Sequence, residues 1–282
     1  MPNSRVPEHP TGAPVRTIHT ITILGGQGKN QLAEPLRRVD LKMGDILSVV
    51  GPTGCGKTTL INDIELYANG TTPTGRTVLI NGEPAPEDYS SDPSANPIAL
   101  ISQHTNFLSD LPVHEFLKTH ARIRGVESPA QAVQETVSFA NQLTGEPIIL
   151  ENAMTELSGG QTRSLLIADA IVIGNSPIIL LDEIENAGIH RTRALELLKG
   201  YKKIFIFVTH DPRIALLSDY RIVMRDGGMQ KLIVTNGEEK GVAQEIRKLD
   251  DFLLSLRQRI RTGEELDQRY VREQLRQLGY AA

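Results

Sequence analysis

The sequence has no tryptophan, a single cysteine and few aromatic side chains, 4% of 282 residues. One cysteine, Cys55, excludes a disulfide framework and a cysteine-based structural zinc site, which indicates a reducing compartment. Lysine and arginine number 30 against 34 acidic residues, so the net charge of −4 lacks the positive excess of nucleic-acid-binding proteins. No apolar run approaches the roughly 18 residues that a membrane span requires. These absences indicate a cytoplasmic protein without a nucleic-acid partner.

The two ends of the chain differ in composition from its middle. Residues 1–16 are rich in proline and have neither the charged start nor the apolar stretch of a signal peptide, so we expect a flexible tail. The main domain covers residues 17–235. Residues 236–282 are charged and form a predicted C-terminal helical extension, because their apolar residues follow a/d spacing over fewer than three heptads: Val242, Ile246, Leu249, Leu253, Leu256 and Ile260.

Four short apolar runs in the main domain each end at a group of polar residues. Because the runs are continuously apolar rather than alternating, they fit strands that are covered on both faces, as in a parallel sheet flanked by helices. A ligand of such a sheet lies beyond the carboxyl ends of its strands, where the polar groups meet. The runs are Ile46–Val50 before Gly51, Ile98–Ile101 before Ser102 and Gln103, Ile178–Leu181 before Asp182 and Glu183, and Ile204–Val208 before Thr209 and His210.

The region between the second and third runs has a different pattern. Residues 113–124 and 130–143 are predicted helices, and the second has a serine cap and a proline at its first position. We therefore expect an inserted helical subdomain over about residues 104–162. Earlier in the chain, the stretch 81–97 is rich in proline, serine and aspartate, which predicts a surface connection.

The most specific motif is GPTGCGKT, which lies between the first run and a predicted helix over residues 57–67. Its glycines allow backbone N–H groups to close around phosphates, and the helix N-terminus adds a positive dipole end. Lys57 supplies a charge and Thr58 a hydroxyl suited to Mg²⁺. The strand–loop–helix context favours a ligand site over a glycine-rich turn that binds nothing. The predicted nucleotide-binding residues are Gly51, Pro52, Thr53, Gly54, Cys55, Gly56, Lys57, Thr58 and Thr59.

Two adjacent acids end the run PIILLDE. Side chains alternate at a strand end, so Asp182 and Glu183 face different tasks, one toward a magnesium ion and the other toward an attacking water. A carboxylate close to Mg²⁺ and phosphates can accept a proton from water. Alone, the pair also fits the capped start of a helix, but the phosphate loop favours catalysis.

The motif LSGGQ places two glycines after Ser158 at the start of a predicted helix over residues 162–173. Its amides and hydroxyl form a second anion-binding site, although one mononucleotide does not need two such sites from one subunit. With the phosphate loop, Gln103, the acids after the third run and His210, in that order, the sequence from about Thr17 to Thr235 resembles the ATP-binding-cassette (ABC) ATPases.

The resemblance implies an α/β fold with a P-loop NTPase, RecA-like core, a parallel sheet and the inserted helical subdomain. It also implies binding and hydrolysis of Mg-ATP. The phosphates would be held by Lys57 and the loop amides, and Mg²⁺ by Thr58, Gln103 and Asp182. Glu183 would be the general base, and His210 would contact the γ-phosphate and position Glu183.

The second anion site implies a partner. By resemblance, Ser158, Gly159, Gly160 and Gln161 would close over ATP bound to a second cassette, so that hydrolysis requires a head-to-tail homodimer or heterodimer with two composite sites.

The sequence departs from the family pattern in two places. Family members commonly stack an aromatic side chain on adenine upstream of the phosphate loop, yet the first Phe, Tyr or Trp here is Tyr67. After the catalytic glutamate, Ile184 stands where proline is usual, and Ile189 where an interface aspartate is usual. Discrimination between bases and communication between the two sites are therefore expected to differ from the family's.

Two classes of function fit these motifs. The first is the ATPase of a transporter, cytoplasmic or peripheral at the inner face of a membrane, which docks on separate permease subunits through its helical subdomain. The second is a soluble ABC ATPase that remodels a protein or metallocofactor assembly, which Ile189 and the C-terminal extension favour. The frequency of the two classes in the family favours transport.

Cys55 carries a further expectation. It lies two residues before Lys57, inside a loop that a ligand must reach. This position predicts an accessible, reactive thiol that bound nucleotide protects.

Overall fold

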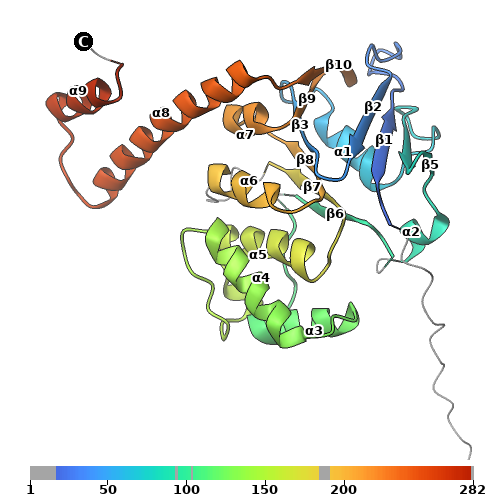
Figure 1. Cartoon of the computed structure of the whole chain (residues 1–282), viewed down its shortest axis with the longest axis horizontal. Coiled ribbons are helices and arrows are strands. Elements are labelled where there is room, and N and C mark those ends of the chain that lie inside the picture. The colour runs from blue at the N-terminus through green and yellow to red at the C-terminus, as the bar shows by residue number, and fades with distance from the viewer. Residues whose placement is uncertain (1–16, 93–94, 103, 184–190, 281–282) are drawn as a thin grey trace, which may run out of the picture.

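The computed structural model describes residues 17–92, 95–102, 104–183 and 191–280. Its centre is a six-stranded sheet in the order β10-β9-β3-β8-β7-β6 (Figure 1). All neighbouring pairs from β9 to β6 are parallel, and β10 is an antiparallel edge strand. The four apolar runs are confirmed as strands of this sheet. Its strands are β3 (Ile46–Val50), β6 (Ile98–Ile101), β7 (Ile178–Asp182), β8 (Ile204–Val208), β9 (Tyr220–Arg225) and β10 (Gly228–Val234).

Strand β7 illustrates why the runs are continuously apolar. Ile178 and Leu180 belong to the core cluster on one face of the sheet, whereas Ile179 and Leu181 belong to the cluster on the other. All four side chains are fully buried. One face is covered by α1 (Lys57–Glu65), and the other by α5 (Gly159–Val172), α6 (Arg191–Lys199) and α7 (Pro212–Leu217).

A second, antiparallel sheet was not expected from the sequence. It has the order β2-β1-β4-β5 and shares a core cluster with α1, which lies between the two sheets (Figure 1). In β2, Val39 and Leu41 are buried while their neighbours are exposed, the alternation of a strand with one solvated face. The strands are β1 (Thr20–Leu24), β2 (Arg38–Lys42), β4 (Thr77–Ile80) and β5 (Glu83–Pro84).

The predicted surface connection over residues 81–97 is corrected in part. It includes β5 and a short helix, α2 (Glu87–Ser91), whose Tyr89 is buried. The ring of Tyr89 lies 5.8 Å from that of Tyr67, measured between centroids. The segment therefore contributes to the core because it carries one large aromatic side chain inward.

Helices α3 (Val113–Ile123) and α4 (Pro129–Leu143) lie where helices were predicted, with a 3-10 turn at Met154–Glu156 before α5. These helices share the core cluster on the α5 side of the sheet. In Figure 1 they form a layer below the strands.

The C-terminal extension forms two helices, α8 (Gly237–Arg261) and α9 (Gln268–Gln277). Ion pairs from Arg221 to Glu239 (2.6 Å) and from Arg213 to Asp250 (2.9 Å) attach α8 to the main domain. The rest of α8 extends away from it (Figure 1). Along the described residues, no helix combines the length and apolar character needed to cross a membrane.

Candidate functional site

The phosphate loop joins β3 to α1. Gly54 and Gly56 have φ of +76° and +96°, a left-handed conformation that glycine adopts without steric cost. A Cβ on Gly56 would also stand only 3.0 Å from the Cα of Gly227 in the turn between β9 and β10. Pro52, Thr53 and Gly54 are exposed. The loop is therefore packed on one side against that turn and open to solvent on the other.

Lys57 is buried across the loop. Its Nζ donates hydrogen bonds to the carbonyls of Gly51 (3.0 Å) and Pro52 (3.2 Å). Thr58 and Thr59 are exposed in the first turn of α1, which contains no acidic residue. No carboxylate in the first turn of α1 therefore offsets the positive end of the helix dipole. This end of the helix is suited to an anionic ligand.

The side chain of Cys55 contradicts the prediction of an accessible thiol. It is 6% exposed and belongs to the apolar cluster under α1. A Cβ on Gly51 would come within 2.7 Å of its Sγ. The loop is reachable through its backbone amides, but the Cys55 side chain points inward and completes the core.

The residues after β7 and β8 meet at the same edge of the sheet. β8 lies between β3 and β7, so the His210 segment separates the phosphate loop from Glu183. The Glu183 N–H donates to the carbonyl of Val208 (3.0 Å), and Glu183 Oε1 is 3.5 Å from His210 Nε2. Both side chains are half-exposed, 32% and 46% respectively. This arrangement suits a solvent-facing base with an imidazole beside it.

Two of the three predicted magnesium ligands fall in the described part of the chain. Asp182 ends β7 and is half-buried, and Thr58 lies in the first turn of α1 at the same edge of the sheet. A carboxylate and a hydroxyl are the hard oxygen donors that Mg²⁺ prefers, so these residues fit the ion. Gln103 lies outside the described residues, as do Ile184 and Ile189.

The LSGGQ motif forms the start of α5. The helix begins at Gly159, three residues earlier than predicted, because Ser158 caps it. The Ser158 hydroxyl accepts from the Gln161 N–H (3.3 Å), and the Gln161 side chain accepts from the Ser158 N–H (2.9 Å). This reciprocal capping box uses the N–H groups of Ser158 and Gln161 and fixes the motif with Ser158 and Gly159 exposed, so the amides of Gly159 and Gly160 can face an anion from another chain.

Sequence reasoning missed a buried ionic cluster beside the phosphate loop. Arg76 is fully buried and contacts Glu34 at 2.6 Å and Asp63 at 2.8 Å. Burial lowers the pKa of the Arg76 guanidinium, but hydrogen bonds and charge from the two carboxylates outweigh burial and raise this pKa overall. No local motif marks the cluster, because its residues come from separate elements.

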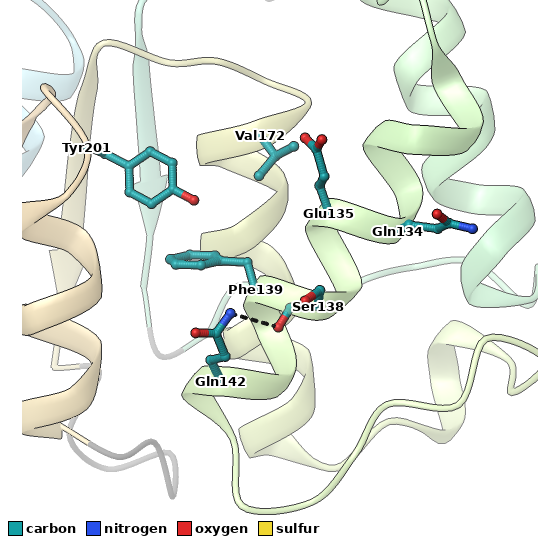
Figure 2. A pocket seen from close by; sticks show the side chains of 7 residues that line it. All are labelled: Gln134, Glu135, Ser138, Phe139, Gln142, Val172 and Tyr201. Atoms are coloured by element: carbon teal, nitrogen blue, oxygen red, sulfur yellow. Dashed lines mark hydrogen bonds between the residues drawn. The ribbon is translucent and has the colours of Figure 1, made fainter.

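A cavity of about 540 Å³ lies elsewhere, between α4, the end of α5 and the residues before β8 (Figure 2). Tyr201 precedes β8, so this cavity is at the amino ends of the strands, opposite the phosphate loop. The Tyr201 and Phe139 rings pack edge to face, 5.3 Å apart, along its wall. Its position excludes it as the phosphate site.

Comparison with known proteins decides the family. A family model described as ABC transporter matches residues 37–186. An uncharacterized ABC transporter ATP-binding protein of Methanocaldococcus jannaschii, MJ0121, is 53% identical over 249 residues, 88% of this chain and 95% of that protein. The chain belongs to the ABC transporter family. As an ABC ATPase it binds ATP and hydrolyses it, as the motifs predicted.

More distant relatives agree with this family. The spermidine/putrescine import ATP-binding protein PotA of Bacteroides fragilis is 30% identical over 202 residues, which cover 69% of this ABC chain but only 42% of PotA. A dimeric cassette, MJ0796, bound to ADP and phosphate superposes with a TM-score of 0.57 at 22% identity, over 77% of this chain and 99% of that one. CbiO1 of Clostridium perfringens gives 0.58 at 21% identity, over 85% and 98%. These likenesses confirm the predicted P-loop NTPase fold.

Proposed function

We propose that this chain is the Mg-ATP-hydrolysing subunit of an ABC transporter, and that it docks as a separate chain on membrane permease subunits. The observation that carries the proposal is the meeting of three groups at one sheet edge: the phosphate loop, Asp182–Glu183 and His210. Family membership and the relative named as a transporter ATP-binding protein support the transport context.

Each group has a proposed task. Lys57 and the loop amides hold the β- and γ-phosphates, and Thr58, Gln103 and Asp182 hold Mg²⁺, which supplies positive charge against the phosphates. Glu183 accepts the proton of the attacking water. His210, 3.5 Å from Glu183, keeps that carboxylate facing the γ-phosphate. The left-handed turn at Glu183, with φ of +50°, contributes to the same orientation.

Hydrolysis is proposed to need two cassettes. Ser158, Gly159, Gly160 and Gln161 are fixed by the capping box at the start of α5, in a second motif separate from the phosphate loop. A second copy or a related cassette would present these residues to ATP in this chain's phosphate loop. The dimeric cassette similar to this chain supports that assembly.

Docking on a permease is supported by exposed apolar residues of the helical subdomain. Leu108 is 98% exposed and Leu111 42%, in the segment that leads into α3. Ile149, 53% exposed, lies in the stretch that pairs with this segment through the Val113 N–H and the Asn152 carbonyl, 3.0 Å apart. Such residues suit a partner's helix and would keep the chain at the inner face of a membrane.

The alternative, a remodelling ATPase without a membrane partner, receives no support from the relatives. Ile189, one of its two motivating features, lies outside the described residues. Purification of the native protein with and without detergent distinguishes the two functions. Only the transporter function predicts that permease chains co-purify.

The chemical core of the proposal is tested by Glu183→Gln. An amide keeps the shape and one acceptor but cannot take the proton, so we expect turnover to fall ~10²- to 10⁴-fold with nucleotide affinity retained. Phosphate release and the Kd for Mg-ATP measure the two effects. Glu238→Gln, an exposed residue in the first turn of α8, is the matched control. Turnover of the Glu183→Gln enzyme close to wild type would exclude Glu183 as the base.

A further inference from the structure

The buried ionic cluster connects three separate parts of the main domain. Arg76, just before β4, donates from Nη1 to Asp63 of α1 (2.8 Å) and from Nη2 to Glu34 (2.6 Å), which lies between β1 and β2. The exposed fraction of the side chain is 0% for Arg76 and Glu34 and 6% for Asp63. One guanidinium thus binds two carboxylates from different elements out of contact with water.

The same guanidinium also bonds to the turn that supports the phosphate loop. Arg76 Nη2 donates to the carbonyl of Gly227 at 2.7 Å. The N–H of Gly227 in turn donates to the carbonyl of Cys55 at 3.0 Å. Two hydrogen bonds therefore lead from the buried charge to the phosphate loop through a single residue. The close approach of Gly227 and Gly56 keeps the turn in van der Waals contact with the loop.

Glu34 fixes the other side of this assembly. Its carboxylate accepts from the N–H groups of Gly26 (2.8 Å) and Met229 (2.5 Å). Met229 lies in β10, next to the β9–β10 turn, and Gly26 lies in the connection between β1 and β2. In that connection, Lys29 donates from Nζ to the carbonyl of Gly54 in the phosphate loop at 2.7 Å. Glu34 therefore fixes the backbone from which Lys29 reaches the loop.

Apolar residues of similar volume fill a core at lower cost than buried charges, because each ion loses its hydration. A planar guanidinium with donors in a fixed fork, by contrast, holds several acceptors at set directions. The Arg76 cluster is therefore suited to holding its hydrogen-bond acceptors in fixed positions, and not only to stabilising the core.

We propose that Arg76 is a positioning residue of the phosphate loop, holding the Gly227 turn and, through it, Cys55 and Gly56 in the conformation that accepts phosphates. The inference rests on the proposed role of the loop as the ATP site. Arg76 is buried behind the loop and acts through Gly227.

Arg76→Lys tests the proposal. Lysine keeps the positive charge between Glu34 and Asp63 but lacks the fork, so it cannot serve both carboxylates and the Gly227 carbonyl together. We expect the Kd for Mg-ADP and Mg-ATP to rise at least about tenfold at a temperature where the variant is fully folded. We also expect faster hydrogen exchange at the Gly227 amide. Turnover at saturating ATP should change less than KM, because Glu183 and His210 follow other strands.

The matched control is Arg221→Lys. Arg221 lies on β9, the strand that leads to the same turn, and its Nη2 contacts Glu239 at 2.6 Å. This substitution also replaces a guanidinium that contacts a carboxylate but leaves the Arg76 cluster intact, so it should lower the melting temperature without changing nucleotide affinity. If Arg76→Lys does not fold, Glu34→Gln is the second variant that tests the proposal. It removes one buried charge, keeps an acceptor for Gly26 or Met229, and should also weaken nucleotide binding.

The outcomes distinguish the proposed function from the proposed role of Arg76. Wild-type protein that binds no Mg-ATP would overturn both the proposed function and this inference. Wild-type protein that binds while folded Arg76→Lys and Glu34→Gln bind equally well, with lower melting temperatures, would leave the function standing and reduce Arg76 to a structural residue. A loss of affinity shared by Arg221→Lys would equally overturn the inference, because it would mark a general effect of destabilisation.

Discussion

Glu183 has a φ of +50°, a left-handed backbone conformation that residues other than glycine seldom adopt. Such a residue costs about 1–3 kcal/mol and persists only where its surroundings hold it. Here its N–H bonds to the Val208 carbonyl, and its carboxylate lies beside His210. The strain coincides with the proposed catalytic base, at the point where the chain leaves β7.

Cys55 gives a direct test of the inward orientation of its side chain. Because the thiol is 6% exposed, we expect a small maleimide to label the native protein slowly, at the same rate with and without Mg-ATP. In urea, labelling should accelerate in parallel with unfolding. Mass spectrometry measures the labelled fraction. Fast labelling that saturating nucleotide blocks would show instead that the thiol faces the phosphates.

Lys203 predicts a pH dependence of stability. It is 7% exposed, and its Nζ donates to Asn175 (2.8 Å) and to the Ser176 carbonyl (2.9 Å). Burial lowers its pKa from 10.5 to about 8. Between these values the unfolded chain binds more protons than the folded one, so this residue adds stability as the pH rises through that window.

Lys203→Met isolates this effect. The difference in free energy of unfolding between wild type and variant should shift in favour of wild type as the pH rises from about 8 toward 10, and stay constant below about 8. Urea denaturation at several pH values measures it. Glu238→Gln, which neither alters Lys203 nor adds a lysine, should show no such shift, and a pH-independent difference for Lys203→Met would contradict the lowered pKa.

At the scale of elements, the sequence predicts best what depends on local pattern. The parallel strands β3, β6, β7 and β8 begin and end within one residue of the prediction, because strands buried on both faces are nearly continuous apolar runs, whereas the parallel strand β9 was not predicted. The phosphate loop could also be predicted, because its glycines and Lys57 all lie within residues 51–57. Helix α5 was predicted three residues short because glycines weaken helices, while the capping box at Ser158 compensates for them.

What the sequence did not predict depends on distant partners. Arg76 is 42 residues from Glu34 and 13 from Asp63, so nothing local relates the three charges. The antiparallel sheet was missed for a similar reason, since β4 is short and pairs with β1 far from it in the chain. Cys55 was misjudged because the motif specifies where the loop lies but not the direction of each side chain.

The C-terminal helices allow a graded truncation. No residue of α9 is buried. Its Tyr270 ring lies under Arg259 of α8, and Tyr280, which follows α9, donates a hydrogen bond to Glu245 of α8. We expect removal of residues 262–282 to change the melting temperature little. Removal of residues 236–282 should lower it by several degrees, because it also deletes three ion pairs and the buried Ala243.

Nucleotide affinity is the second measurement for this pair of truncations. Both shortened proteins should bind Mg-ATP as the full chain does, since the phosphate loop and the Arg76 cluster precede the deleted segments. Loss of binding by a folded truncation would place part of the site in the extension.

For the whole molecule, the proposed composite site predicts complementation between two inactive variants. Gly159→Asp puts a negative charge where phosphate should bind, and a Cβ at this exposed position meets nothing within 4 Å, so the fold should tolerate it. Mixed with Glu183→Gln, half of random dimers pair the two variants and contain one intact site. Activity should recover to about a quarter of wild type, the fraction of intact sites in such a mixture.

Phosphate release from the mixture, compared with each variant alone, measures this recovery. Mixing Glu183→Gln with a Lys57→Ala variant is the control, because both changes affect the same half-site. In those heterodimers each of the two sites carries one defect, Lys57→Ala in one and Glu183→Gln in the other, so neither site is whole. Activity of the first mixture no higher than that of this control would argue that each chain completes its site by itself.

Helix α8 gives the molecule a lever arm. Asp211, directly after His210, caps α7 and binds Arg213, which also holds Asp250 in the middle of α8. Beyond that ion pair, residues 251–261 project for about 16 Å. A tilt of ~10° at α7 would thus displace the end of the helix by ~3 Å. A rotation of α7, which begins two residues after His210, would therefore be carried to the end of α8 as a displacement of a few ångströms.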